Sequence, residues 1–310
     1  MMAIGPWSAQ PKGAQRKWLV ATATVALLVA GCSSYDSRQG SGQGSSHNSS
    51  EDSRQDSSQH VRPVTHESLN AALWNQTSAE YIAVTSQAYQ LAAANLDLAL
   101  ADTQWTAALE QRQDYSDLPP AVLMDIDETV LDNSRYNARI ITQHGEYSQA
   151  TFTAWCEEVA ATAIPGAKAF VDHASARGVT VIYYSRRLEQ LRDCTTKNLD
   201  VLGFPLPDPR YLWLNNKQAA TSKAQIRAEL ATEFRILLLI GDDLGDFVAA
   251  SKAAPEVRRA LSSQHLERWG RQWIILPNPM YGSWETSLYG ADYGAPRAEK
   301  LNAKAGHLND

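Results

Sequence analysis

Short apolar runs alternate with longer amphipathic stretches from residue 119 onwards, and this alternation limits the folds available to the chain. The runs that we expect to be strands are residues 121–125, 179–184, 211–214, 235–240 and 273–276. The stretches that we expect to be helices lie near residues 150–161, 165–177, 188–201, 221–232 and 245–253. Strands that alternate with helices build βαβ units and a mostly parallel sheet, so we predict an α/β fold. In such sheets ligands bind beyond the carboxyl ends of the strands.

The stretch that precedes this core has a different composition. Residues 65–113 are rich in Ala, Leu and Gln and contain no Pro or Gly. This composition favours helix, and the apolar residues recur at helical spacings. We therefore expect residues 65–118 to be an N-terminal helical segment that packs on a core of residues 119–290. A small cap insertion is expected near residues 135–165, and residues 291–310 are expected to form a C-terminal tail.

The N-terminal residues have the pattern of a secretory signal. Three basic residues precede an apolar segment from Trp18 to Ala30. That segment is shorter than the roughly 20 apolar residues of a membrane-spanning helix. It runs into Cys32 through Val-Ala-Gly, which resembles a bacterial lipobox. The resemblance implies that residues 1–31 are removed and that Cys32 is lipidated; a plain signal peptide and an apolar anchor helix are the alternatives.

The next segment is expected to be a tether. Residues 33–62 are rich in Ser, Gln, Gly, Asp and His and have almost no aliphatic side chains. Such a segment buries too little apolar surface to offset the loss of chain entropy. We interpret residues 32–64 as a lipidated, flexible tether to a membrane. Ser33 occupies the position where Asp would favour the inner membrane, so the resemblance to lipoprotein sorting rules favours the outer membrane of the cell envelope.

Charge and cysteine content exclude some classes of partner and site. The net charge is −6 and there is no long basic run, so nucleic acid is not expected as a partner.

Besides Cys32 the chain has only Cys156 and Cys194, which lack metal-ligand spacing. We expect these two to be buried free thiols. An oxidising envelope would permit a disulfide, but spacing alone does not establish that the two are close.

Two carboxylates follow the first apolar run. Asp125 and Asp127 are spaced i, i+2, so both point to one side of the strand's end. Two like charges this close repel each other unless a cation joins them or one acid holds a proton. The pair therefore predicts a metal-assisted nucleophile with an acid/base partner. The alternative is an ordinary junction of strand and turn with solvated acids.

Polar residues also follow the later runs. Ser185 and Arg187 come after the second run, and hydroxyl and guanidinium donors suit a phosphate. Lys223 opens an expected helix and could neutralise a phosphoryl oxygen, or could simply lie on the surface. Asp242 and Asp246 follow the fourth run and suit a hard cation such as Mg²⁺, or complement a helix dipole.

The order of these groups resembles the haloacid dehalogenase superfamily of phosphohydrolases: Asp-x-Asp, then Ser, then Lys, then Gly-Asp-x-x-x-Asp. The blocks at residues 122–136 and 239–247 narrow the resemblance to the bacterial class C acid phosphatases, which include outer-membrane lipoprotein 5′-nucleotidases. Residues 74–81 and 276–284 support it. The resemblance covers about residues 70–290 and implies a Rossmannoid core.

By this resemblance, Asp125 is the nucleophile that forms an aspartyl-phosphate. Asp127 protonates the leaving alkoxide and then deprotonates the attacking water. The implied cofactor is Mg²⁺, held by the Asp125 carboxylate, the Asp127 backbone carbonyl and Asp242, with Asp246 as a ligand or a support.

The resemblance also implies how the substrate is held. Ser185 and Lys223 would hold the phosphoryl oxygens, and Arg187 would belong to the substrate-binding residues. Trp155 and Tyr281 match positions where an aromatic ring or nucleobase stacks, which is worth ~1–3 kcal/mol per base. The alternative is that both aromatic residues only pack. Asn133 and Tyr136 are weaker candidates for the same pocket.

Two residues depart from the family pattern. Asp243 stands where Asn or Thr is usual and adds a negative charge near the metal. Arg186 stands where Asn is common and could change the shape of the phosphate pocket.

The implied activity is Mg²⁺-dependent hydrolysis of small-molecule phosphomonoesters, chiefly nucleoside 5′-monophosphates and aryl phosphates. One alternative is a phosphotransferase or a narrow-specificity phosphatase of the same superfamily. Another is a surface binding lipoprotein without activity. The sequence leaves a homodimer open.

Overall fold

The computed structural model describes residues 64–112, 114–206, 208–216, 222–249 and 252–309. The expected signal peptide, Cys32 and all but the last residue of the expected tether lie outside these residues. No helix within the described part of the chain is long and apolar enough to cross a bilayer.

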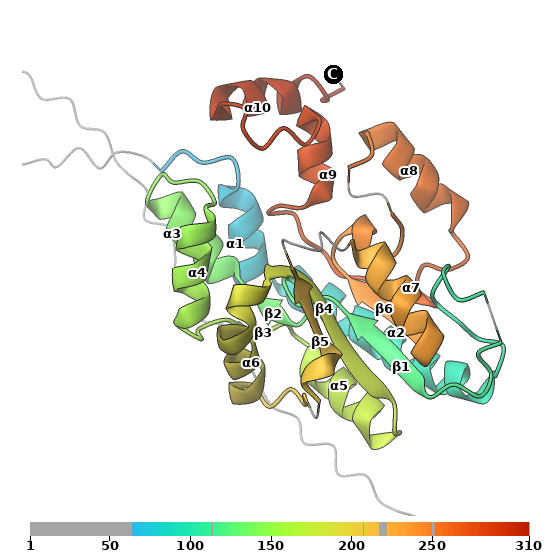
Figure 1. Cartoon of the computed structure of the whole chain (residues 1–310). Helices are drawn as coiled ribbons and strands as arrows, with labels where there is room; N and C mark the ends of the chain where they lie inside the picture. The colour runs from blue at the N-terminus through green and yellow to red at the C-terminus, as the bar shows by residue number, and fades with distance from the viewer. Residues whose placement is uncertain (1–63, 113, 207, 217–221, 250–251, 310) are drawn as a thin grey trace, which may run out of the picture. The chain divides into compact units, whose positions relative to one another are not determined.

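A five-stranded sheet forms the centre of the described residues, in the order β5-β4-β1-β6-β7 (Figure 1). Its strands are β1 (Pro120–Met124), β4 (Thr180–Leu188), β5 (Leu212–Asn215), β6 (Arg235–Gly241) and β7 (Trp273–Ile275). All four pairings are parallel, which confirms the predicted α/β fold and its parallel sheet. After β1 the chain builds one side of the sheet with β4 and β5, then crosses to the other side with β6 and β7. The end of β1 is therefore the switch point at which such sheets bind ligands.

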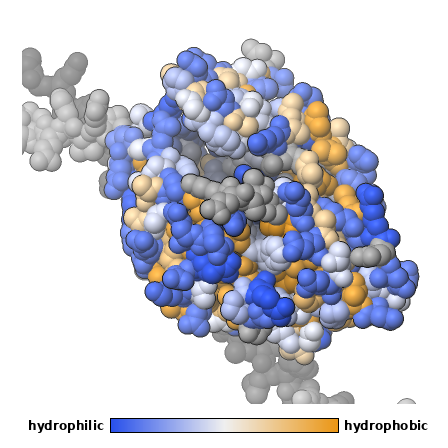
Figure 2. Space-filling model, in the orientation of Figure 1, coloured by the Kyte–Doolittle hydropathy of each residue, from blue (hydrophilic) through white to orange (hydrophobic). Residues whose placement is uncertain are grey.

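Helices cover both faces of the sheet, which explains the continuous apolar runs. Val122 and Met124 of β1 point into one core, with α2 (Ala79–Ala101) and α5 (Ala167–Ala176). Ala121 and Leu123 alternate with them and point into the opposite core, with α7 (Lys223–Glu233). Figure 1 shows α7 and α2 on opposite sides of the sheet. On the face drawn in Figure 2, hydrophilic residues predominate and apolar residues lie in small groups between them.

The remaining α-helices and strands lie before, between or after these strands. They are α1 (Leu69–Thr77), β2 (Leu131–Asp132), α3 (Ser134–Thr142), α4 (Gln149–Glu157), β3 (Thr162–Ala163), α6 (Arg192–Val201), α8 (Pro255–Gln264), α9 (Ser283–Thr286) and α10 (Arg297–Ala305). β2 and β3 form a short antiparallel pair. Helices α3 and α4 come between β2 and β3 in the chain, within the region expected to form the cap.

Two expected helices differ from the structure. The N-terminal helical segment ends at Ala101, and the described residues after it contain no further helix before β1. There Trp105 Nε1 donates to the Leu237 carbonyl at 2.8 Å, so this stretch is bound to β6 instead.

The helix expected at 245–253 is also wrong in its described part, which holds only a 3₁₀ turn, η3 (Leu244–Asp246). Asp243 caps that turn, and the next helix begins at Pro255, where proline is favoured.

The expectation of two free thiols is wrong. Cys156 of α4 and Cys194 of α6 form a disulfide with their Cα atoms 5.6 Å apart. The two residues are 38 positions apart in the chain, and only the packing of α4 on α6 brings them together.

Candidate active site

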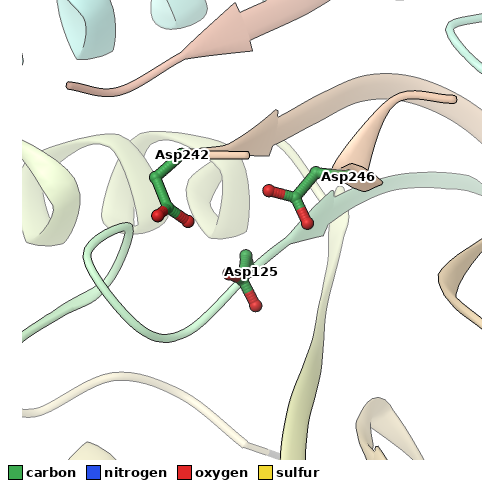
Figure 3. Close-up of side chains that lie close together, drawn as sticks. All are labelled: Asp125, Asp242 and Asp246. Atoms are coloured by element: carbon green, nitrogen blue, oxygen red, sulfur yellow. The ribbon is translucent and has the colours of Figure 1, made fainter. Parts of the chain in front are cut away.

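Three carboxylates meet at the ends of two neighbouring strands. Asp125 follows β1, and its backbone N–H donates to the Ile240 carbonyl of β6 at 2.9 Å. Asp242 follows β6 directly, and Asp246 ends the 3₁₀ turn η3. One oxygen from each carboxylate lies within 4.8 Å of the others, and Figure 3 shows the three side chains close together.

Lys223 brings a cation to this group from the first turn of α7. Ser222 caps the helix, so the lysine is the first helical residue. Its Nζ lies 2.6 Å from Asp125 Oδ1 and also donates to Asp246. The ammonium group sits 4.8 Å from the ring centroid of Tyr184, on the face of that ring. The structure thus brings Lys223, Asp125 and Asp246 together, as the sequence predicted.

Burial and neighbouring carboxylates raise the pKa of each of the three carboxylates. Burial, the nearby Asp246 and Asp127 raise the pKa of Asp125 to about 7, although Lys223 opposes this shift. Burial and the neighbouring carboxylates also raise the pKa of Asp242 well above its ordinary value. If all three carboxylates are ionised, one ammonium leaves two negative charges in excess. Oxygen ligands with this charge fit a hard divalent cation.

Asn278 is a neighbour of Asp242 that the sequence reasoning missed. Its Nδ2 donates to Asp242 Oδ2 at 2.7 Å. It follows β7 and therefore lies at the same end of the sheet as the other groups. The rule that located Asp242 could have located it, because residue 278 is the first side chain with an amide after the last apolar run.

Asp127 points to a different set of partners. It accepts hydrogen bonds from Arg187 Nη2 at 2.8 Å, Arg187 Nε at 3.0 Å, Asn133 Nδ2 at 2.8 Å and Ser185 Oγ at 3.2 Å. Burial raises the pKa of Asp127, but the Arg187 guanidinium and these hydrogen bonds outweigh it and hold the pKa below its usual range. Asp127 is thus a carboxylate held by three other side chains, and it lies near enough to Asp125 to raise the pKa of that residue.

Ser185 and Arg187 both donate hydrogen bonds to the Asp127 carboxylate. Ser185 is buried, and its Oγ accepts from the Arg187 N–H at 3.1 Å while donating to Asp127. The Arg187 side chain is only 2% exposed. Contact of either residue with substrate therefore stays a prediction, and the interactions of Arg187 with Asp127 were not foreseen.

The two aromatic candidates are placed differently. Trp155 is 2% exposed, and its indole N–H donates to Asn133 Oδ1 at 2.9 Å. The Arg139 guanidinium lies 5.5 Å from its ring centroid, and the Tyr136 ring lies 6.3 Å away. This placement favours the alternative that Trp155 is a packing residue.

Tyr281 is only partly buried and lies in the loop after β7. Its hydroxyl donates to Glu128 Oε1 at 2.9 Å. Glu128 is fully buried and has a backbone φ of 55°, which is uncommon for a residue other than glycine. The sequence reasoning passed over Glu128 because a carboxylate just after Asp-x-Asp has no distinguishing spacing. Stacking of Tyr281 on a substrate ring stays a prediction.

The two departures from the family pattern have separate surroundings. The Asp243 carboxylate accepts from the Ser283 N–H at 2.7 Å and lies 3.7 Å from Arg258. Its carboxylate is thus held by that loop, while its charge contributes to the raised pKa of Asp246. Arg186 is exposed, between the buried residues Ser185 and Arg187.

Known proteins resemble this chain in sequence and fold. A family model described as HAD superfamily, subfamily IIIB (acid phosphatase), matches residues 42–284. The structure of the class C acid phosphatase from Bacillus anthracis matches this chain with 30% sequence identity and a TM-score of 0.72. The match covers 78% of this chain and 97% of that chain. The crystal structure of that class C acid phosphatase with tungstate bound matches with 30% identity, the same coverage and a TM-score of 0.71.

Proposed function

Because the chain belongs to subfamily IIIB of the HAD superfamily and is a phosphomonoesterase, we propose that it acts through an aspartyl-phosphate formed on Asp125. The observation that carries this proposal is the meeting of Asp125, Asp242 and Lys223 from β1, β6 and α7. Phosphoryl transfer depends mainly on positioning and charge stabilisation. It therefore needs a nucleophile, a cation-binding carboxylate and a fixed ammonium group at one point.

The reaction has two steps in this proposal. An oxygen of Asp125 attacks phosphorus and the bond to the ester oxygen breaks. Asp127, in the protonated form that Arg187 disfavours in the free enzyme, gives its proton to the departing alkoxide. Water then attacks the aspartyl-phosphate and gives a proton to Asp127, and the bond between phosphorus and Asp125 oxygen breaks. Lys223 stabilises negative charge on the phosphoryl oxygens throughout.

Asp125, Asp242 and Asp246 would hold the metal, which we propose to be Mg²⁺. When bound, Mg²⁺ reduces the repulsion between the attacking carboxylate and the phosphate. The three oxygen donors and their excess negative charge support this choice of cation.

We propose nucleoside 5′-monophosphates and aryl phosphates as the substrates. Tungstate, which the Bacillus anthracis relative binds, is a tetrahedral oxyanion like phosphate. The Tyr281 ring, held near the site by Glu128, is the group available for stacking on a base or aryl ring.

For location, we propose that lipid on Cys32 anchors the enzyme in the cell envelope, at the outer membrane. The support is the lipobox pattern at residues 29–32 followed by Ser33. Recovery of a Cys32→Ser chain in the membrane fraction, at the level of the natural chain, would contradict the anchor.

The test measures phosphate release with Mg²⁺ and with EDTA, for the natural enzyme and for Asp125→Asn. We expect EDTA to abolish activity and Asp125→Asn to lower kcat by about 10⁴-fold or more. Asp172→Asn is the matched control, because Asp172 is exposed and pairs only with Lys168 among the described contacts.

A panel of AMP, nicotinamide mononucleotide, sugar phosphates and p-nitrophenyl phosphate separates a broad phosphatase from a narrow one. Activity unchanged by both EDTA and Asp125→Asn would reject the mechanism, and no activity under any condition would favour a binding lipoprotein.

A further inference from the structure

The Arg187 guanidinium is buried directly behind a carboxylate that solvent can reach. Its Nε and Nη2 both donate to Asp127, at 3.0 and 2.8 Å. The Arg187 side chain is 2% exposed, whereas the Asp127 side chain is 20% exposed. Asp127 is therefore more accessible to a substrate than Arg187 is.

The far side of the guanidinium is fixed by two helices. Arg187 Nη1 donates to Thr195 Oγ1 of α6 at 3.0 Å and lies 3.6 Å from Cys156 Sγ of α4. The Phe152 ring of α4 lies 5.3 Å from the guanidinium carbon. The disulfide between Cys156 and Cys194 joins these two helices covalently. The guanidinium thus has little freedom to move away from Asp127.

Asn133 fixes the same carboxylate from another direction. Its Nδ2 donates to Asp127 Oδ1 at 2.8 Å. Its Oδ1 accepts the indole N–H of Trp155 at 2.9 Å. The indole therefore sets which end of the amide faces Asp127, because only the amide nitrogen can donate.

We propose that Arg187 is a positioning residue that holds Asp127 in reach of the leaving-group oxygen, and that it thereby determines how well the enzyme cleaves esters of weakly acidic alcohols. This inference rests on the proposed acid/base role of Asp127. A planar guanidinium fixes a carboxylate through two donors, whereas a lysine supplies a single mobile charge. An alkoxide needs a proton in order to leave, but p-nitrophenolate is a stable anion and leaves without one. Loss of positioning should therefore harm the two kinds of ester unequally.

The test compares kcat/KM for AMP and for p-nitrophenyl phosphate, because kcat/KM reports the first phosphoryl transfer, in which the leaving group departs. For Arg187→Lys we expect kcat/KM for AMP to fall about 10²-fold, the size of effect that a misplaced catalytic group produces. For p-nitrophenyl phosphate we expect a fall of less than about 5-fold, since only the proton transfer is impaired. The loss for AMP should lie in kcat, with KM nearly unchanged. Asp127→Asn should show the same selectivity with a larger loss.

Two further variants keep the result interpretable. Arg210→Lys is the matched control. It should leave kcat/KM unchanged for both substrates, because Arg210 is 78% exposed and pairs with Asp208 on the surface. If Arg187→Lys does not fold, Thr195→Val removes one support of the guanidinium and preserves the side-chain shape. It should lower kcat/KM for AMP about 10-fold and spare p-nitrophenyl phosphate.

Equal losses on both substrates would overturn the proposal in favour of a purely structural role. A raised KM with unchanged kcat would overturn it in favour of direct phosphate binding by Arg187. If Asp127→Asn itself shows no dependence on the leaving group, the acid/base role fails and this inference fails with it. Asp125→Asn tests the nucleophile independently of both.

Discussion

Gly241 leaves the space that the Asp246 side chain occupies beside Asp125 and Asp242. A Cβ atom at position 241 would lie 2.1 Å from Asp246 Oδ2, far inside contact distance. We expect Gly241→Ala to displace the carboxylate, to weaken Mg²⁺ binding about 10–100-fold and to cost about 1–3 kcal/mol of stability. Calorimetric titration with Mg²⁺ checks the first effect and urea denaturation the second. Gly294→Ala is the control, because its Cβ would meet nothing closer than 3.4 Å. Unchanged Mg²⁺ affinity in Gly241→Ala would refute this role for the glycine.

At the scale of elements, the disulfide links helix α4 to helix α6. It closes a loop between residues 38 positions apart, and in the chain-entropy model a loop of this length stabilises the fold by about 2–4 kcal/mol. We expect the double variant Cys156→Ser, Cys194→Ser to lose that amount in the free energy of unfolding, measured with urea. Dithiothreitol should lower the midpoint of the natural chain and leave that of the double variant unchanged. A natural chain whose midpoint resists full reduction, confirmed by thiol titration, would count against this account.

At the scale of the whole molecule, folding gathers charges that repel each other, so stability should depend jointly on pH and metal. The pKa of Asp125 rises from 3.8 to about 7 on folding, mainly through burial. Its contribution to stability is therefore present below about pH 4 and is lost as pH rises towards about 7. The Mg²⁺ that we propose would bind the ionised carboxylate, so the gain in Tm with Mg²⁺ over EDTA should grow across this window. At a free Mg²⁺ concentration of about 100 times Kd, the gain in the free energy of unfolding is about 2.7 kcal/mol. Thermal denaturation at several pH values checks this, and a gain that shrinks as pH rises would contradict it.

The sequence by itself determined the α/β class, the five strands of the main sheet and the polar groups at their ends. These are local properties: a strand buried on both faces is a continuous apolar run, and side chains at i and i+2 point to one side. Asp125, Asp242 and Asp246 could be expected to meet because parallel strands end at the same edge, whereas Lys223 was placed with them by the family resemblance alone.

Only the tertiary structure decided which groups touch within that edge. The pairing of Arg187 with Asp127, the packing of Trp155 and the Cys156–Cys194 disulfide join residues 22 to 60 positions apart. Local spacing contains no information about such contacts, because they depend on how α4 and α6 pack beside β4. The helix expected at 245–253 was wrong in its described part, where the chain forms only the 3₁₀ turn Leu244–Asp246 with Asp243 as its cap.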